Sequence, residues 1–478
     1  MLNSIINIIF IPEIFLASTS FICLLFGLYI NKNSFRQTCN FAVSILLLTS
    51  ILVYFNTGSN FANYEILFSK SSFINFFKIL VLLGSAASIL ISKDYFLGIK
   101  LLNFEIPILL LFSTLGMMLM ISASNLMSMY LAIELQSLSL YVAAAIKRDS
   151  LYSAESGVKY FILGALSSGI LLYGFSLIYG FTGSMSFDEI NFYLLKYENL
   201  NLGLIFGLVF VMVGLAFKVS AVPFHMWTPD VYEGAPNSIT AFFAIVPKIA
   251  AVALIYRFCL VPFENFYLEW SQIVIFLSVA SMFLGAIAAI AQSNIKRLLA
   301  YSSIGHIGYI LIALVAANED GVKAASIYMF SYMIMNIAVF AILLSIKVKK
   351  EYLVNISDLR GLSKSNPIVS LSISIIMLSM AGIPPFIGFF GKFYVFIAAI
   401  ENELYFLSIL GVLASVISAY YYLRIIKIMY FDDNNSESLV IFKISFQSKV
   451  ILSLSLFIII CFIFYPSLLI NISANLRI

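Results

Sequence analysis

Charged residues are scarce in this sequence. Asp, Glu, Lys and Arg together make up 10% of the 478 residues, whereas the hydrophobic set makes up 62%. A soluble domain carries about 25% charged residues, because its surface must be solvated by water. The scarcity therefore excludes a soluble domain, a disordered chain and a charge-rich coiled coil. It predicts a membrane protein whose outer surface faces lipid.

Cysteine and histidine are also rare. The four cysteines are scattered without a close pair, and the two histidines are too few to ligate several haems; they are Cys23, Cys39, Cys259, Cys461, His225 and His306. Zinc and iron–sulfur sites need clustered ligands. We therefore expect no redox cofactor in this chain. The net charge of +4 is small for this length and gives no sign of nucleic-acid binding.

Long apolar runs are abundant. A membrane-spanning helix needs about 20 mainly apolar residues, and the sequence offers fourteen such stretches, at 9–30, 41–55, 73–92, 104–122, 124–145, 158–182, 202–222, 237–257, 270–292, 300–317, 322–346, 367–400, 404–426 and 450–471. The longest breaks, 183–201, 347–366 and 427–449, read as polar loops. The first run lacks a basic leader and a small-residue cleavage site, so we expect no cleavable signal. The predicted fold is all-α and polytopic.

Lysine and arginine gather in alternate breaks between the predicted spans. They are frequent in the odd-numbered breaks, as in Lys147-Arg148 and Lys296-Arg297, and sparse in the even-numbered ones, where Arg257 stands. Basic residues favour the cytoplasmic or matrix side of a membrane. With fourteen spans, this bias predicts that both termini face the periplasm or the intermembrane space.

Five lysines fall inside predicted spans. Lys78 and Lys159 lie near the starts of theirs, where a lysine usually extends to the headgroups, and we interpret them in that way. Lys218, Lys248 and Lys392 lie deeper. Lysine at such depth costs about 2.5–3.5 kcal/mol on insertion scales, so it normally faces the interior of a bundle and pairs with another group.

Glu134 is the carboxylate that matches these lysines, because it lies halfway along its predicted span. One carboxylate and three ammonium groups cannot all pair. Lys218 precedes Pro223, Lys248 follows Pro247, and Lys392 follows Pro384-Pro385. Helix breaks at mid-membrane are tolerated where they line a hydrated cavity. We therefore expect a proton relay through Glu134, Lys218, Lys248 and Lys392. The alternative is that Glu134 and Lys218 form an ion pair that merely fixes helix packing.

The two histidines permit two readings. His225 lies at the first break and His306 among hydroxyls and glycines on a predicted helix. Histidine titrates near neutral pH, so either residue could pass protons, but a lone histidine is as often just hydrogen-bonded structure. Asp230 and Glu233 are read as loop residues with a capping or loop-closing role, and Trp227 as an anchor at the headgroups.

Several of these segments together resemble one family, subunit N of respiratory complex I, which is equivalent to mitochondrial NADH dehydrogenase subunit 2. The resemblance covers essentially the whole chain and is carried by the Glu134 span, Pro247-Lys248 and three strings: VPFHMWTPDVYEGAP at 222–236, YSSIGHIGY at 301–309 and GIPPFIGFFGK at 382–392. Where the family commonly continues Ala-Pro-Thr-Pro, this chain has Ala235-Pro236-Asn237-Ser238. The loss of the second proline should slightly loosen the start of the next helix.

The resemblance implies an antiporter-like fold of two inverted five-helix repeats, each with one discontinuous helix. The implied division is 1–103 for helices 1–3, 104–258 for repeat one, 259–430 for repeat two and 431–478 for the last loop and helix. It also implies that Glu134, Lys218, Lys248 and Lys392 correspond to the family's charged residues on helices 5, 7, 8 and 12.

The resemblance further implies a proton-translocating subunit of NADH:quinone oxidoreductase in a bacterial cytoplasmic or mitochondrial inner membrane. The implied partners are the antiporter-like M and L subunits, the small J and K types and the peripheral arm. Flavin, iron–sulfur clusters and quinone would be bound by those partners and not by this chain. The alternatives are a subunit of an Mrp-type cation/proton antiporter and a purely structural membrane scaffold.

Overall fold

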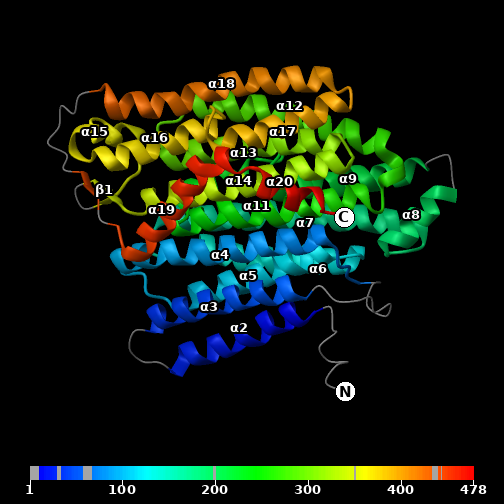
Figure 1. Ribbon diagram of the computed structural model, residues 1–478. Helices are drawn as coiled ribbons and strands as arrows, with labels where there is room; N and C mark the ends of the chain where they lie inside the picture. Colours follow the sequence, from blue (N-terminus) through cyan, green and yellow to red (C-terminus); the bar gives the residue numbers. More distant parts are fainter. Residues whose placement is uncertain are drawn as a thin grey trace.

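The computed structural model describes residues 10–29, 34–56, 67–196, 201–348, 351–432, 440–442 and 444–478. Nearly all of them are helical. The long helices lie side by side, with α2 (Ile11–Tyr29) and α3 (Ser34–Phe55) at one edge of the array and α18 (Tyr405–Tyr430) at the other (Figure 1). The prediction of an all-α polytopic architecture is therefore confirmed.

The remaining helices follow in chain order. The first half contains α4 (Ser72–Gly98), α5 (Glu105–Ser122), α6 (Leu126–Ala144), α7 (Leu151–Thr182), the short α8 (Phe187–Lys196), α9 (Leu202–Val219), the short α10 (Trp227–Gly234) and α11 (Asn237–Leu260). The second half contains η1 (Glu264–Phe266), α12 (Tyr267–Ile290), α13 (Ile295–Val315), α14 (Glu319–Leu343), η2 (Ile356–Leu359), α15 (Leu362–Ser365), α16 (Pro367–Ala381), α17 (Ile387–Glu401), α19 (Phe446–Cys461), η3 (Phe462–Phe464) and α20 (Ser467–Ala474).

Thirteen helices of the described residues are long and apolar enough to cross a membrane. The remaining predicted span, 367–400, is divided between α16 and α17, which have 15 residues each. At 1.5 Å per residue neither half reaches across a hydrocarbon core of about 30 Å. The two halves together correspond to one discontinuous span, as the Pro384-Pro385 sequence suggested.

Several predicted boundaries were wrong, because caps and charges extend helices beyond the apolar runs. Helix α7 begins at Leu151 and not at 158, since Ser150 caps it by accepting the backbone N–H of Ser153. Helix α13 begins at Ile295 and not at 300, since the side chain of Asn294 accepts N–H groups of the first turn. Hydroxyl and amide side chains at such positions satisfy the free N–H groups of a helix start.

The last predicted span, 450–471, is also interrupted. Helix α19 ends at Cys461, and α20 begins after Pro466. Two predicted loops, 347–366 and 427–449, contribute short strands to one antiparallel sheet in the order β2-β1-β3, where β1 is Ile346–Val348, β2 is Glu351–Tyr352 and β3 is Val440–Phe442. The sheet thus joins the connection that follows α14 to the connection that follows α18.

The core of the molecule is formed by α11, α13 and α14. The apolar stretch of helix α11 is completely buried, and those of α13 and α14 are almost completely buried. Helices α2, α7 and α18 instead expose large apolar side chains such as Leu25, Phe161 and Val416. A helix that is apolar on every side must be surrounded by other helices or lipid. The central three helices therefore fix the positions of the side chains that they carry.

Candidate functional site

Lys218 and Glu134 meet near a shared serine. Lys218 lies in the last turn of α9 and donates a hydrogen bond to Oγ of Ser137 on α6 at 2.8 Å. Glu134 lies one turn earlier on α6, and its Oε1 is buried without a hydrogen-bond partner among the described residues. No ion pair joins Glu134 to Lys218 in the portion of the chain that the structure describes. The geometry therefore does not support the alternative in which Glu134 and Lys218 form a fixed ion pair.

The first break separates α9 from α10. Helix α9 ends where Ser220 adopts a left-handed φ of 65°. The N–H of Val222 then donates to Oγ of Ser281 on α12 at 2.9 Å, which fixes the unwound segment. His225 lies in this segment and is half-buried, and its Nδ1 has no partner among the described residues. Among the described residues, therefore, no hydrogen bond joins the side chain of His225 to the lysines.

Trp227 does not anchor the chain at the headgroups, contrary to the prediction. Its side chain is buried, its Nε1 donates to the carbonyl of Phe217 at 3.1 Å, and its ring stacks on Tyr160 with centroids 4.5 Å apart. The indole instead closes the break by connecting α10 to the last turn of α9. The carbonyl of Phe217 also accepts the backbone N–H of Ser220, so the indole adds a second hydrogen bond at the end of this helix.

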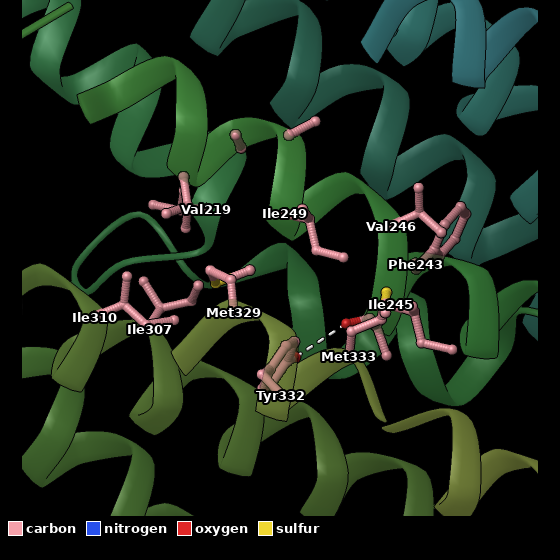
Figure 2. Close-up of a cluster of buried hydrophobic side chains, with 14 of the residues drawn as sticks. Val219, Phe243, Ile245, Val246, Ile249, Ile307, Ile310, Met329, Tyr332 and Met333 are labelled. Carbon is pink, nitrogen blue, oxygen red and sulfur yellow. Dashed lines mark hydrogen bonds between the residues drawn. The ribbon is translucent and has the colours of Figure 1, made fainter. Parts of the chain in front are cut away.

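Lys248 is the most deeply buried of the relay candidates, with 1% of its surface exposed. Its Nζ donates to Oγ of Ser303 on α13 at 2.9 Å. Apolar side chains surround the neighbouring turns, including Val219, Ile249, Ile307 and Met329, and the hydroxyl of Tyr332 donates to the carbonyl of Ala244 (Figure 2). Because apolar side chains pack against these turns, a positive charge on Lys248 depends on its few polar contacts.

His306 lies one turn beyond Ser303 on α13 and is bracketed by two tyrosines. Its Nδ1 is 2.7 Å from the hydroxyl of Tyr328 on α14, and its Nε2 is 3.1 Å from the hydroxyl of Tyr422 on α18. The Tyr422 hydroxyl is in turn 2.5 Å from Oγ of Ser302. The imidazole is thus the centre of a hydrogen-bonded chain that connects three helices.

Lys392 lies beside the second break. Its Nζ donates to the carbonyl of Ala381, at the end of α16, and to Oγ of Ser415 on α18, each at 2.9 Å. The ammonium also lies 4.8 Å from the ring centroid of Tyr309, a cation–π distance. Lys392, His306, Tyr309 and Tyr422 line one cavity of about 10 Å³, which is about the least volume that admits one water molecule.

An ion cluster at one end of the bundle holds α10 in place. Asp230 binds Lys159 of α7 at 2.8 Å and Arg297 of α13 at 2.9 Å, and Arg297 also binds Glu233 at 2.8 Å. Partial burial raises the pKa of Asp230, but the hydrogen bonds from Lys159 and Arg297 lower it by more, so this pKa lies below its usual value. Asp230 and Glu233 were predicted to lie in a loop, but they belong to helix α10. Their ion pairs nevertheless fasten this segment to α7 and α13, as the predicted loop-closing role requires.

Sequence reasoning missed one carboxylate within a span. Glu13 on α2 is buried and forms an ion pair with Lys78 on α4. The prediction that Lys78 extends to the headgroups was therefore wrong, whereas Lys159 is partly exposed. Glu13 lies at the start of an apolar run, where a glutamate usually indicates a solvent-exposed first turn of a helix. Only the packing of α2 against its neighbours buries it.

The sequence placed Arg257 in an outer loop, which was also wrong. Arg257 lies in the last turn of α11 and is 2% exposed. Its guanidinium donates to the carbonyls of Ile121 and Ala123 at 2.7 and 2.6 Å. Because α11 is central, even its end is covered by other helices, which hydropathy alone does not reveal.

No group of three or more His, Cys, Asp or Glu side chains capable of holding a metal ion occurs among the described residues. The candidate site consists instead of amines, hydroxyls and one imidazole spread along the bundle. Such groups exchange protons and can do so without a change in oxidation state. The arrangement and the two discontinuous helices define the class of antiporter-like, multi-pass membrane proteins.

The comparisons with known proteins agree with that class. A family model described as "NADH:quinone oxidoreductase/Mrp antiporter, TM" matches residues 123–418. NADH-quinone oxidoreductase subunit N 1 of Rhizobium meliloti is 50% identical over 89% of this chain and 88% of its own length. The subunit N of Pelagibacter ubique is 48% identical over 98% of both chains. This chain belongs to the subunit N family of NADH-quinone oxidoreductases.

Solved structures share the fold. A chain of respiratory complex I from Thermus thermophilus, determined with bound aureothin, superposes with a TM-score of 0.82 at 29% identity and covers 98% of this chain and 100% of its own. A chain of the Mrp complex from Dietzia superposes with a TM-score of 0.81 at 20% identity, covering 97% of this chain and 96% of its own. The second likeness concerns the fold alone.

Proposed function

We propose that this chain translocates protons as a membrane subunit of NADH-quinone oxidoreductase, and that Glu134, Lys218, Lys248 and Lys392 form its relay. The observation that carries the proposal is the connected stretch on α13. There Ser303 holds Lys248, and His306, one turn away, shares a cavity with Lys392. Two buried amines on different helices are thus linked through one helix that carries hydroxyls and an imidazole.

The proton steps follow from these contacts. A proton that enters near Glu134 and Lys218 charges the amine held by Ser137. Its arrival favours release of the proton on Lys248, because like charges repel; at an effective dielectric constant near 20 the repulsion is about 4 kcal/mol at about 4 Å and falls in inverse proportion to the distance. Moving one charge against 100 mV costs about 2.3 kcal/mol. The neighbouring charge therefore supplies energy of the required order.

The second half of the path passes through His306. Its ring nitrogens face the hydroxyls of Tyr328 and Tyr422, which can both donate and accept hydrogen bonds. A proton leaving Lys248 through Ser303 can be relayed by the imidazole to the cavity beside Lys392. His225 takes the lesser role of a group near the entry side, because no described hydrogen bond connects it with the lysines.

The finer assignments belong to the same proposal. Both termini face the periplasm or the intermembrane space of an energy-converting membrane. The partners are M-, L-, J- and K-type membrane subunits and a peripheral arm, which bind the flavin, iron–sulfur clusters and quinone. Residues 104–258 and 259–430 form the two repeats, each with one discontinuous helix, between the N-terminal segment 1–103 and the C-terminal segment 431–478.

The experiment compares variants within the intact complex in sealed membrane vesicles. Lys218→Ala and Glu134→Ala should severely reduce NADH-driven proton pumping, because each removes a charge carrier. Lys427→Ala is the matched control, since this lysine is exposed in the last turn of α18, and it should pump normally. Unchanged pumping by Lys218→Ala would favour a structural scaffold, and sodium transport by the isolated chain would favour a cation antiporter.

A further inference from the structure

A second buried pair of titratable side chains lies outside the relay. Glu13 and Lys78 are 3% and 5% exposed and form an ion pair between α2 and α4. The Oε1 atom of Glu13 accepts from Lys78, but Oε2 is buried and has no hydrogen-bond partner within the described ranges of the chain. A buried carboxylate oxygen without a donor is costly, so this atom indicates that a donor is still to be supplied.

A polar cavity adjoins the pair. It measures about 10 Å³ and is lined by Asn56, Ser69, Lys70, Asn75 and Lys78, together with Pro12 and Val53. This is room for about one water molecule, and five of the seven lining residues carry polar side chains of the kind that a buried water needs. The cavity lies where α2 begins, α3 ends and α4 begins, so it is near one surface of the membrane.

The cavity wall is connected to the helix that carries Lys248. Ser69 accepts a hydrogen bond from Arg257 of α11, and the same guanidinium holds the carbonyls of Ile121 and Ala123 at the connection between α5 and α6. Helix α4, which carries Lys78, packs along α11. These contacts connect the Glu13–Lys78 pair with the helices that carry Lys248 and Glu134.

We propose that Glu13 and Lys78 form a second proton-binding site, loaded through water in the cavity lined by Asn56, Ser69 and Lys70. Lys78 lines the cavity and donates to Oε1 of Glu13. It passes one proton to Glu13, which becomes a neutral carboxyl group, and takes a proton from a hydronium ion in the cavity, so that Lys78 stays an ammonium; the reverse steps return the proton to water. Loading leaves the positive charges of Lys78 and Lys70 on the wall of the cavity and that of Arg257 behind it, bound to Ser69. Their mutual repulsion makes the loaded state responsive to charge on α11.

A purely structural pair predicts something different. Replacing a buried ion pair with apolar side chains of similar size is often neutral for stability, whereas removing one partner leaves an unpaired charge. The double variant Glu13→Leu/Lys78→Met therefore separates the two roles, because it restores packing without restoring a proton acceptor. Glu189→Gln is the matched control, since Glu189 is an exposed carboxylate that accepts from Ser184.

The test uses the intact complex in sealed vesicles and rests on the proposed function only for its pumping readout. We expect Glu13→Gln and the double variant to assemble and to oxidise NADH but to move fewer protons per NADH, while Glu189→Gln is unchanged. Infrared difference spectra during turnover should contain a protonated-carboxyl band that Glu13→Gln lacks.

Full proton pumping by the double variant, or an infrared spectrum in which Glu13→Gln loses no carboxyl band, would overturn the second site. Lys248→Met is measured in parallel. If Lys248→Met pumps normally, the relay fails, yet the infrared band still reports on Glu13 independently.

Discussion

At the scale of the residue, the three lysines of the proposed relay share one kind of neighbour. Lys218, Lys248 and Lys392 donate to the hydroxyls of Ser137, Ser303 and Ser415, respectively. A hydroxyl accepts from an ammonium and can rotate to donate to a neutral amine, whereas a carboxylate stabilises only the charged form. Serine therefore tolerates both protonation states of a buried lysine, which a proton carrier requires.

Ser303 offers a direct test of this reasoning. Ser303→Asp should hold Lys248 in its charged form and lower NADH-driven pumping by roughly tenfold or more, since 1.4 kcal/mol of extra stabilisation corresponds to a factor of ten. Ser303→Thr keeps the hydroxyl and should pump close to normally. Pumping rates in vesicles containing the intact complex measure both. Equal rates for the two variants would contradict a role for the hydroxyl.

At the scale of the element, the two breaks combine a left-handed residue with a lysine. Gly382 ends α16 with a φ of 85°, and a Cβ placed there would lie 2.8 Å from Cδ of Lys392. The lysine thus packs directly on the backbone of the break. Glycine allows this close approach because it has no side chain and adopts positive φ without strain.

Gly382→Ala should therefore displace Lys392 and strain the break. We expect a loss of roughly 1–2 kcal/mol from the left-handed conformation alone, seen as a lower unfolding temperature of the purified complex, together with reduced proton pumping. The control is Gly169→Ala, because a Cβ at Gly169 meets nothing within 4 Å. A Gly382→Ala complex that pumps as well as this control would show that the position of Lys392 is not critical.

The ion cluster around α10 predicts a dependence on pH. The pKa of Asp230 is lowered in the folded chain, so its contribution is fully present above the unfolded pKa of about 3.9 and is lost as the pH falls through the lower folded pKa. Hydrogen exchange of α10 should accelerate as the pH falls through that region, after correction for the intrinsic rate. Asp230→Asn should exchange faster at neutral pH and lack the acid-dependent step; an unchanged acid-dependent step would assign it to another group.

The elements could be predicted from the sequence only to a limited extent. Apolar runs and prolines predicted the number of spans and both breaks, because lipid demands continuous helices and proline interrupts them. The burial of Glu13 and Arg257 could not be predicted, since it depends on which helices cover α2 and the end of α11. The Tyr422 hydroxyl beside His306 is likewise a tertiary contact between α18 and α13, with no local sequence signal.

At the scale of the whole molecule, contacts between loops that are distant in the sequence show which helix connections lie at the same end of the bundle. At one end, β1 pairs with β3, the tilted rings of Tyr95 and Tyr352 are in contact, and Arg424 donates to the carbonyl of Ile290. At the other end, Asn318 donates to Asn402 and Ser72 donates to the carbonyl of Asn475. The described basic residues of the breaks that these contacts connect, among them Lys347 and Arg424, thus lie at one end, which supports the span count.

The sidedness of the membrane then follows from charge and can be measured. The basic end should face the cytoplasm or matrix. A cysteine at Lys427 should resist an impermeant thiol reagent added from the outer side, whereas a cysteine at Glu403, between α17 and α18, should react. The unsubstituted chain is the control, because Cys23, Cys39 and Cys259 are buried and Cys461 is partly covered. Labelling of the Lys427→Cys variant alone from outside would reverse the orientation, and with it the direction in which the relay must carry protons.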